Sequence, residues 1–327
     1  MKPTSALPLH TASRTSRRSS HSRSRFAGRV RAALGLLACL CLSGAVLGAD
    51  TASAQTPTLV WEAKGLARPE SVLYDPATDV LYVSNLNSAV MVKDGNGFIS
   101  RIKPDGTILE RKWAAGLDSP TGMGLHDRTL YVADVDRLLA LSAGSGSIDK
   151  TYKAAGAIFL NDLVVAEDGT VYVSDTPMNT IWRLKDGVFE PWLTDDVLNG
   201  PNGLVIQDGK LVVASLGRLK SAGQEPETAG LFAIDVEDKA ITPLSKPVGH
   251  LDGLATLKPG SYLASDWGNG ALYKIDVKGK GNAKVDTLLD LNQGSADLIY
   301  MADKQLVLIP MMLDNTLAAY SLGTAKP

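Results

Sequence analysis

Six polar side chains occupy the same position in a recurring phrase of this sequence, each directly before a short apolar run. They are separated by 51, 40, 41, 50 and 45 residues. The six are Glu70, Thr121, Asn161, Asn202, Asp252 and Asp297. Carboxylate and amide oxygens are the ligands that a hard cation such as Ca²⁺ prefers. If the fold brings these positions to one axis, Glu70, Asn161, Asn202 and Asp252 form a divalent-metal site that can polarise a carbonyl oxygen.

The spacing of the phrase predicts the fold that would position these side chains. A repeat of this length built from short strands is typical of a β-propeller, in which each repeat is one blade. Each apolar run is followed by a tight turn such as Asp168-Gly169 and by a β-branched and aromatic strand such as 171–175 (VYVSD). A third and a fourth strand follow in most repeats. The sequence therefore predicts an all-β, six-bladed β-propeller.

The last repeat, residues 294–322, has room for only three strands. The start of the mature chain offers a spare strand at 58–62 (TLVWE). If this strand joins the last blade, it closes the ring and covers edges that an open array would expose. Two long connections, 86–97 and 216–229, are expected on the face that carries the six polar side chains, where loops commonly select substrates.

The first 54 residues predict a cleavable signal peptide. Residues 1–31 carry eight basic groups and no acid, residues 32–47 are almost wholly apolar, and Ala52-Ser53-Ala54 forms a small-x-small cleavage site. We expect a cut after Ala54, a periplasmic or secreted protein, and a propeller domain over 55–327. The apolar stretch is too short for stable membrane insertion. The pair Arg17-Arg18 leaves open whether export uses the general secretory or the twin-arginine route.

Composition excludes several kinds of chemistry. Both cysteines, Cys39 and Cys41, lie in the predicted leader, so the mature domain has no disulfide, thiolate nucleophile or cysteine-bound metal. Removal of the leader leaves 25 basic against 34 acidic groups, a net charge of about −9, which argues against nucleic acid as a partner. A small-molecule substrate and a monomer are expected. No phosphate loop, serine elbow, His-Glu-x-x-His or dinucleotide fingerprint is present.

Four short motifs resemble one known family. They are Arg68-Pro69-Glu70-Ser71, Asn161-Asp162, Pro201-Asn202-Gly203-Leu204 and Leu251-Asp252-Gly253-Leu254. This pattern resembles the family of senescence marker protein, gluconolactonase and luciferin-regenerating enzyme, which are six-bladed propellers related to diisopropyl-fluorophosphatase and, more distantly, to paraoxonase. The resemblance covers essentially all of residues 57–322.

The resemblance implies a function and a set of roles. Glu70, Asn161, Asn202 and Asp252 look like the metal ligands, with Ca²⁺ expected and Zn²⁺ or Mn²⁺ as alternatives, and Asp162 looks like the acidic neighbour that contacts substrate or assists catalysis. One departure concerns the substrate. The sugar-lactone hydrolases of the family hold substrate with an arginine shortly before the Asn-Asp pair, whereas residues 157–160 here are Ala, Ile, Phe and Leu. A more apolar substrate would suit that wall.

Two functions of different class follow. The first is a metal-dependent hydrolase of lactones or related esters, with Asp162, Asp252 or His250 as the candidate base. The second is a non-catalytic propeller that serves as a binding or interaction module, because histidine is scarce and the family's arginine is missing. It also stays open whether the ring residues only close turns, since Asn and Asp before glycine often bond their own backbone.

The second strands also end in polar residues. Their last side chains include Asn85, Asp134, Asp175 and Asp266. Short acidic and amide side chains favour local bonds to backbone amides. We therefore expect these four to bond the backbone of the loop that follows each strand rather than to take part in chemistry.

Overall fold

The computed structural model describes residues 56–218 and 227–323, which belong to one compact unit. The predicted signal peptide, residues 1–54, and the centre of the second long loop lie outside the described residues. In the described part, no helix has the length and apolar character that crossing a membrane requires. Two 3-10 helices, η1 (Thr176–Met178) and η2 (Asp196–Leu198), accompany the strands.

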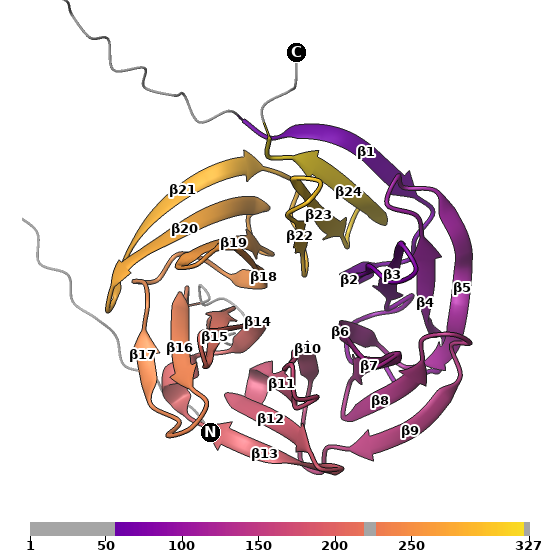
Figure 1. The fold of residues 1–327 in the computed structure, drawn as a ribbon, viewed down its shortest axis with the longest axis horizontal. Helices are drawn as coiled ribbons and strands as arrows, with labels where there is room; N and C mark the ends of the chain where they lie inside the picture. The colour runs from indigo at the N-terminus through magenta and orange to yellow at the C-terminus, as the bar shows by residue number, and fades with distance from the viewer. Residues whose placement is uncertain (1–55, 219–226, 324–327) are drawn as a thin grey trace, which may run out of the picture. The chain divides into compact units, whose positions relative to one another are not determined.

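Across residues 56–218 and 227–323, twenty-four strands form six antiparallel sheets of four strands each, and Figure 1 shows the sheets following one another around a ring. The strands nearest the axis are β2 (Pro69–Asp75), β6 (Pro120–His126), β10 (Leu160–Val165), β14 (Pro201–Gln207), β18 (Leu251–Lys258) and β22 (Ile299–Met301). The second strands are β3 (Val80–Asn85), β7 (Thr129–Asp134), β11 (Val171–Asp175), β15 (Lys210–Ser215), β19 (Ser261–Asp266) and β23 (Leu306–Met311). The fold is the predicted six-bladed β-propeller.

The two outer positions of each blade complete the sheets. The third strands are β4 (Gly97–Ile102), β8 (Arg137–Ser142), β12 (Thr180–Lys185), β16 (Leu231–Asp235), β20 (Ala271–Gly279) and β24 (Thr316–Ser321). The outermost strands are β5 (Ile108–Leu117), β9 (Ile148–Lys153), β13 (Val188–Thr194), β17 (Ile241–Pro243), β21 (Asn282–Asp290) and β1 (Thr58–Lys64). Strand β1 pairs antiparallel with β24, so the N-terminal strand closes the last blade as predicted.

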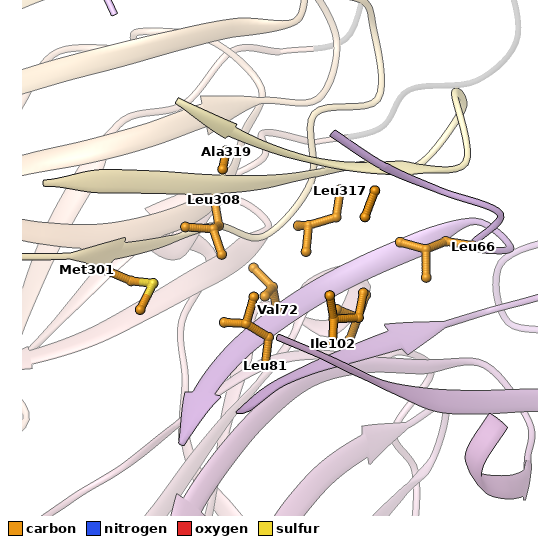
Figure 2. Close-up of a cluster of buried hydrophobic side chains, with 10 residues drawn as sticks. Leu66, Val72, Leu81, Ile102, Met301, Leu308, Leu317 and Ala319 are labelled. Carbon is orange, nitrogen blue, oxygen red and sulfur yellow. The ribbon is translucent and has the colours of Figure 1, made fainter. Parts of the chain in front are cut away.

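In the described residues, six large apolar clusters lie one at each interface between neighbouring blades, and a smaller seventh cluster contains Leu86, Ala296 and Met312. Side chains of a strand alternate between its two faces, so β3 sends Leu81 and Val83 toward the last blade and Tyr82 toward the next one. Figure 2 shows the first cluster, where Leu81 lies near Leu308 and Leu317. Burial of each such side chain stabilises the fold by roughly 1.5–3 kcal/mol.

The inner strands approach one another most closely at glycines. A Cβ atom on Gly203 of β14 would lie 2.4 Å from the backbone oxygen of Asp252 and 2.8 Å from the backbone nitrogen of Leu254. Both neighbours are backbone atoms of β18, so no side-chain rotation can relieve the contact. The absence of a side chain at this position lets two blades meet at the axis.

This contact predicts the effect of one added methyl group. The variant Gly203→Ala should lose about 1–3 kcal/mol of unfolding free energy because it overpacks the junction of two blades. Gly144→Ala is the matched control, since its Cβ would meet only flexible side-chain atoms, the nearest at 3.4 Å. Chemical denaturation of both variants measures the difference. Equal stability of the two variants would contradict the close packing.

Candidate metal centre at the propeller axis

The axial end of each blade carries the same one-residue β-bulge. In the first blade the pairing passes from Pro69↔Asn85 to Val72↔Val83, so two residues of β2 oppose a single residue of β3. The same shift occurs at the start of β6, β10, β14 and β18. Before β22, the pairs Ser295↔Met311 and Ile299↔Leu308 enclose three residues of the inner segment against two of β23, so one extra residue is again present. Bulges re-aim side chains next to functional sites. The predicted ring residue is the first of the two bulged residues in the first five blades, and in the sixth blade Asp297 is the middle one of the three enclosed residues.

All six ring side chains are buried, with at most 8 % of each exposed, as in Asp297. Three of their oxygens have no hydrogen-bond partner in the part of the chain that the structure describes. These are Glu70 Oε2, Asn161 Oδ1 and Asn202 Oδ1. Buried acceptors without a partner cost about 1–3 kcal/mol each and are rare in folded proteins. All three belong to the four side chains predicted to bind a metal.

Hydrogen bonds hold the two asparagine amides with their oxygens unpaired. Asn161 Nδ2 donates to Thr176 Oγ1 at 3.1 Å, and Asn202 Nδ2 donates to Asp252 Oδ1 at 3.0 Å. The side chain of Asn202 therefore bonds a residue of the next blade, whereas the turn reading required a bond to its own backbone. A cation is the ligand that would satisfy such oxygens.

The carboxyl groups around the axis have raised pKa values because they are buried close to one another. Burial, and next the charge of Asp252, raises the pKa of Glu70 well above its usual range. Burial and the charge of Asp297 raise the pKa of Asp252 to about 8 and that of Asp162 well above its ordinary value. Burial alone raises the pKa of Asp297 to about 7, against the bond from Ser71. A positive charge at the axis would reverse these shifts, because it favours the ionised form.

The donor set fits a hard divalent cation. Glu70 and Asp252 would supply carboxylate oxygens, and Asn161 and Asn202 would supply the two unpaired amide oxygens. This mixture suits Ca²⁺, which accepts carboxylates, amide carbonyls and water. Among the described residues, no three His, Cys, Asp or Glu side chains are gathered as a metal site. The predicted set contains only two such residues, so it depends on the asparagines.

Asp162, a predicted catalytic residue, occupies the second bulged position of β10. Its Oδ1 accepts from Leu163 N at 2.7 Å, and its Oδ2 accepts from Leu204 N of the next blade at 2.7 Å. Each oxygen of the carboxylate thus accepts a backbone amide, and the side chain links the third blade to the fourth. Its role as a base remains a prediction that must compete with this structural role.

The other two ring residues also connect blades. Thr121 Oγ1 donates to Leu160 O of the third blade at 3.1 Å. Asp297 Oδ2 accepts from Ser71 Oγ of the first blade at 2.6 Å. Both side chains are thereby engaged with the protein, and neither belongs to the four side chains predicted to bind a metal.

His250, the remaining candidate base, lies partly buried in the loop before β18. Its Nδ1 lies 2.9 Å from the backbone oxygen of Leu216. Because a carbonyl oxygen can only accept, Nδ1 must carry the proton, and Nε2 of the neutral ring then holds a lone pair. The imidazole is therefore prepared as an acceptor two residues from Asp252.

The polar ends of the second strands bond backbone amides, but mostly those of a different loop from the one predicted. Asp134 accepts from Ser119 N at 2.8 Å, and Asp175 accepts from Phe159 N at 3.1 Å. Both donors precede the inner strand of the same blade. Antiparallel pairing places the end of the second strand beside the start of the first, which explains the difference. Asp266 accepts from His250 N, in the loop before the inner strand, and from Gly268 N, in the loop that follows its own strand.

Three serines that sequence reasoning missed stabilise the bulges. The bulged amide of Ser71 donates to Ser84 Oγ at 2.9 Å, and that of Asp162 donates to Ser174 Oγ at 3.0 Å. Gly253 N donates to Ser265 Oγ at 2.8 Å in the fifth blade. The signal in the sequence was the serine before the last residue of YVSN, YVSD and LASD, which recurs in alternate blades.

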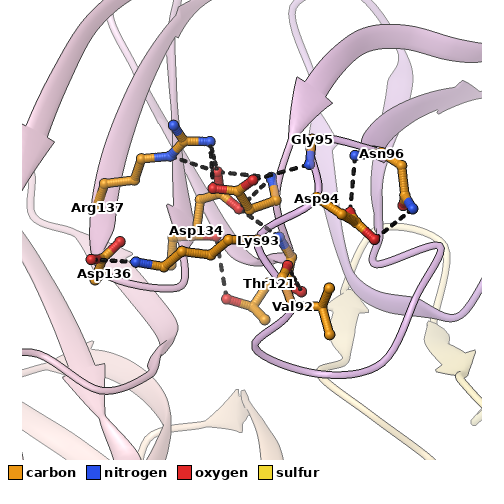
Figure 3. A network of polar contacts seen from close by, with 12 residues as sticks. Val92, Lys93, Asp94, Gly95, Asn96, Thr121, Asp134, Asp136 and Arg137 are labelled. Atoms are coloured by element: carbon orange, nitrogen blue, oxygen red, sulfur yellow. Dashed lines mark hydrogen bonds and ion pairs between the residues drawn. The ribbon is translucent and has the colours of Figure 1, made fainter.

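The long loop between β3 and β4 is anchored to the second blade (Figure 3). Lys93 forms an ion pair with Asp136 at 2.5 Å, and Gly95 N donates to Asp118 Oδ1 at 3.1 Å. Ser119 Oγ donates to Val92 O at 3.1 Å. The loop therefore has a defined conformation at the face where the inner strands begin.

The apolar wall predicted at residues 157–160 is only partly accessible. Phe159 and Leu160 are buried, whereas the side chain of Ile158 is 49 % exposed. The backbone N–H of Phe159 also donates to Asp175, and this hydrogen bond fixes the loop. Of this stretch, Ile158 is the side chain that a substrate could readily contact.

Comparison with known proteins supports the fold. No family model matches the sequence, and no curated protein matches it. Among solved structures, a gluconolactonase from Xanthomonas campestris is 16% identical, with a TM-score of 0.57 over 82% of this chain and 95% of that one. A streptogramin B lyase is 13% identical, with a TM-score of 0.57 over 82% of this chain and 98% of that one. The molecule thus shares the propeller fold of a gluconolactonase and of a lyase.

A further neighbour extends the range of proteins with this architecture. A chain of the mitotic checkpoint complex is 11% identical, with a TM-score of 0.54 over 77% of this chain and 74% of that one. The three neighbours share a fold, although one is a gluconolactonase, one a lyase and one a chain of a checkpoint complex. Function must therefore be argued from the side chains at the axis.

The raised pKa values predict how pH and calcium act on stability. Without metal, the folded protein keeps protons on Asp252 and Asp297 up to pH values near 8 and 7, whereas unfolded aspartate releases them near about 3.9. The folded state then binds more protons than the unfolded state, so unfolding free energy falls as pH rises from about 4 to about 8. In EDTA, the unfolding free energy should therefore fall by several kcal/mol between pH 5 and pH 8.5, and Tm by on the order of 10 °C.

Calcium should change this dependence. A bound cation replaces the protons, so millimolar calcium should raise Tm more at pH 8.5 than at pH 5. Thermal denaturation by circular dichroism at both pH values, with calcium and with EDTA, measures the effect. The same pH dependence under both conditions would argue against a cation among these carboxyl groups.

Proposed function

We propose that this protein is an exported, divalent-metal-dependent hydrolase of lactones or related esters, with the metal at the propeller axis. The observation that supports this proposal most directly is the set of three buried, unpartnered oxygens from Glu70, Asn161 and Asn202. They belong to three blades and occupy the same bulged position. The fold shared with a gluconolactonase is compatible with such a reaction.

Calcium is the proposed metal, with zinc or manganese as alternatives. Glu70, Asn161, Asn202 and Asp252 would hold it, and when bound it would polarise the substrate carbonyl and stabilise the oxyanion. Two carboxylates give a site of modest charge, which suits an exported protein because extracellular calcium modules work at 10⁻⁴–10⁻³ M. A periplasmic or secreted location rests on the leader, residues 1–54.

The chain's own groups would orient the substrate and move the proton. The hydrogen bond from Asn202 to Asp252 fixes both side chains before substrate arrives. Among the candidate bases, His250 has a free lone pair on Nε2, whereas both oxygens of Asp162 already accept backbone amides. We therefore favour His250 as the group that takes a proton from the attacking water, with Asp252 as the next candidate.

A first prediction tests the metal centre. Asn202→Ala removes one unpaired oxygen and the donor to Asp252, so calcium affinity should fall at least about 100-fold and kcat/KM at least about 100-fold. Isothermal titration calorimetry, elemental analysis and a panel of lactones, esters and phosphotriesters measure these changes. Asn282→Ala, at an exposed position of β21, is the matched control and should keep both properties.

Two outcomes would reject the hydrolase. One is a purified protein that contains no divalent ion and binds none. The other is a panel without turnover by the metal-loaded protein, which would favour the alternative of a non-catalytic binding propeller. Retention of hydrolysis by Asn202→Ala would place the reaction elsewhere.

A second prediction tests the base. His250→Gln should lower kcat by roughly 100-fold because a positioned general base contributes 10²–10⁴-fold. The calcium content of the variant should stay at the wild-type level. A kcat within about threefold of wild type would leave Asp252 or Asp162 as the base.

A further inference from the structure

Arg68 lies two residues before Glu70, in the loop that leads into β2. Its backbone N–H donates to Asn315 Oδ1 at 2.8 Å, and its backbone oxygen accepts from Leu86 N at 3.1 Å. Its φ of 51° is in the left-handed region, which a non-glycine residue seldom adopts. The residue is thus held in an unfavourable conformation by contacts from the first and last blades. Such outliers often mark functional positions.

The guanidinium of Arg68 has N–H donors without a hydrogen-bond acceptor among the described residues. Its Nη2 contacts the sulfur of Met312 at 3.6 Å, and its Nε is buried without a hydrogen-bond partner. No ion pair within residues 56–218 and 227–323 involves this side chain. Met312 and Leu86 form a small apolar cluster beside it. A permanent cation in this setting lacks the anion that would normally accompany it.

The position of Arg68 relates it to the axis. The loop before β2 and the turn between β23 and β24, which contains Met312 and Asn315, both lie at the end of the blades where the inner strands begin. That end carries the ring residues. Arg68 makes no hydrogen bond to a ring carboxylate within the described residues, so no ring carboxylate competes with a substrate for its guanidinium.

The chemistry of the side chain indicates what that molecule carries. The planar guanidinium matches a carboxylate and binds it through two parallel hydrogen bonds. The carboxyl groups around the axis would repel an anion, and Arg68 supplies a local opposing charge. We propose that Arg68 binds a carboxylate of the substrate, so the preferred substrates are esters or lactones with a carboxylate near the reacting carbonyl. This proposal rests on the proposed function for its reaction, but not for the binding of the anion.

A pair of probes that differ in one group tests this. The 4-nitrophenyl monoester of succinic acid carries a carboxylate where 4-nitrophenyl butyrate carries a methyl group. The calcium-loaded wild type should prefer the succinate ester in kcat/KM. The ratio of the two values should fall at least about tenfold in Arg68→Gln and less in Arg68→Lys. Arg183→Gln, which removes a half-buried cation paired with Glu190 on the outer strands, should keep the wild-type ratio.

A binding experiment separates this inference from the hydrolase. Succinamate and butyramide resemble the two esters but resist hydrolysis, and calorimetric titration of the calcium-loaded protein measures their binding. Tighter binding of succinamate that Arg68→Gln abolishes would support the role of Arg68, even if neither ester is hydrolysed and the proposed function fails. Equal binding of the two amides by wild type would overturn the inference, as would an unchanged preference in Arg68→Gln. If Arg68→Gln does not fold, Arg68→Met, which keeps the apolar stem beside Met312, replaces it.

Discussion

In each blade the inner strand has one residue more than its partner between two successive ladder pairs, and the architecture of the axis follows from this mismatch. A regular strand would send alternate side chains into the two blade interfaces. The extra residue interrupts that alternation at one point, so a polar side chain can be buried at the axis without entering an apolar cluster. In three blades a serine hydroxyl accepts a hydrogen bond from the displaced amide, so the bulge leaves none of these three amides unpaired.

This arrangement buries four acidic groups close to one another, which disfavours their ionised forms. Glu70, Asp162, Asp252 and Asp297 are all removed from water, and burial is the largest cause of the raised pKa of each. Three of the four also accept a hydrogen bond from a neighbouring blade, Asp297 from Ser71, Asp162 from Leu204 and Asp252 from Asn202. Asp252 therefore joins two blades and is also one of the side chains predicted to bind a metal. Glu70 differs, because its Oε2 has no hydrogen-bond partner among the described residues.

Much of the fold was predictable because a propeller repeats its pattern. The spacing of the phrase predicted six blades, and the shortage of strands in the last repeat predicted the closure by β1. The ring positions were also predictable, since one register position recurs. The use of each oxygen was not, because several of the partners belong to another blade, as in the bond from Leu204 to Asp162, which lie 42 residues apart. Likewise, the lack of an ion-pair partner for Arg68 could not be predicted, because it depends on which side chains lie near it in the fold.

The closure of the ring joins distant parts of the chain. Strand β1 pairs with β24 from Thr58↔Ser321 to Lys64↔Thr316, and most side chains of β1 are exposed. The pairing therefore relies on backbone hydrogen bonds whose formation carries a large loop-closure entropy, so it is expected late in folding. Until then, the edge of β24 is open to the β1 strand of a second copy. The feature that completes the monomer thus also provides a route to a domain-swapped dimer at high protein concentration.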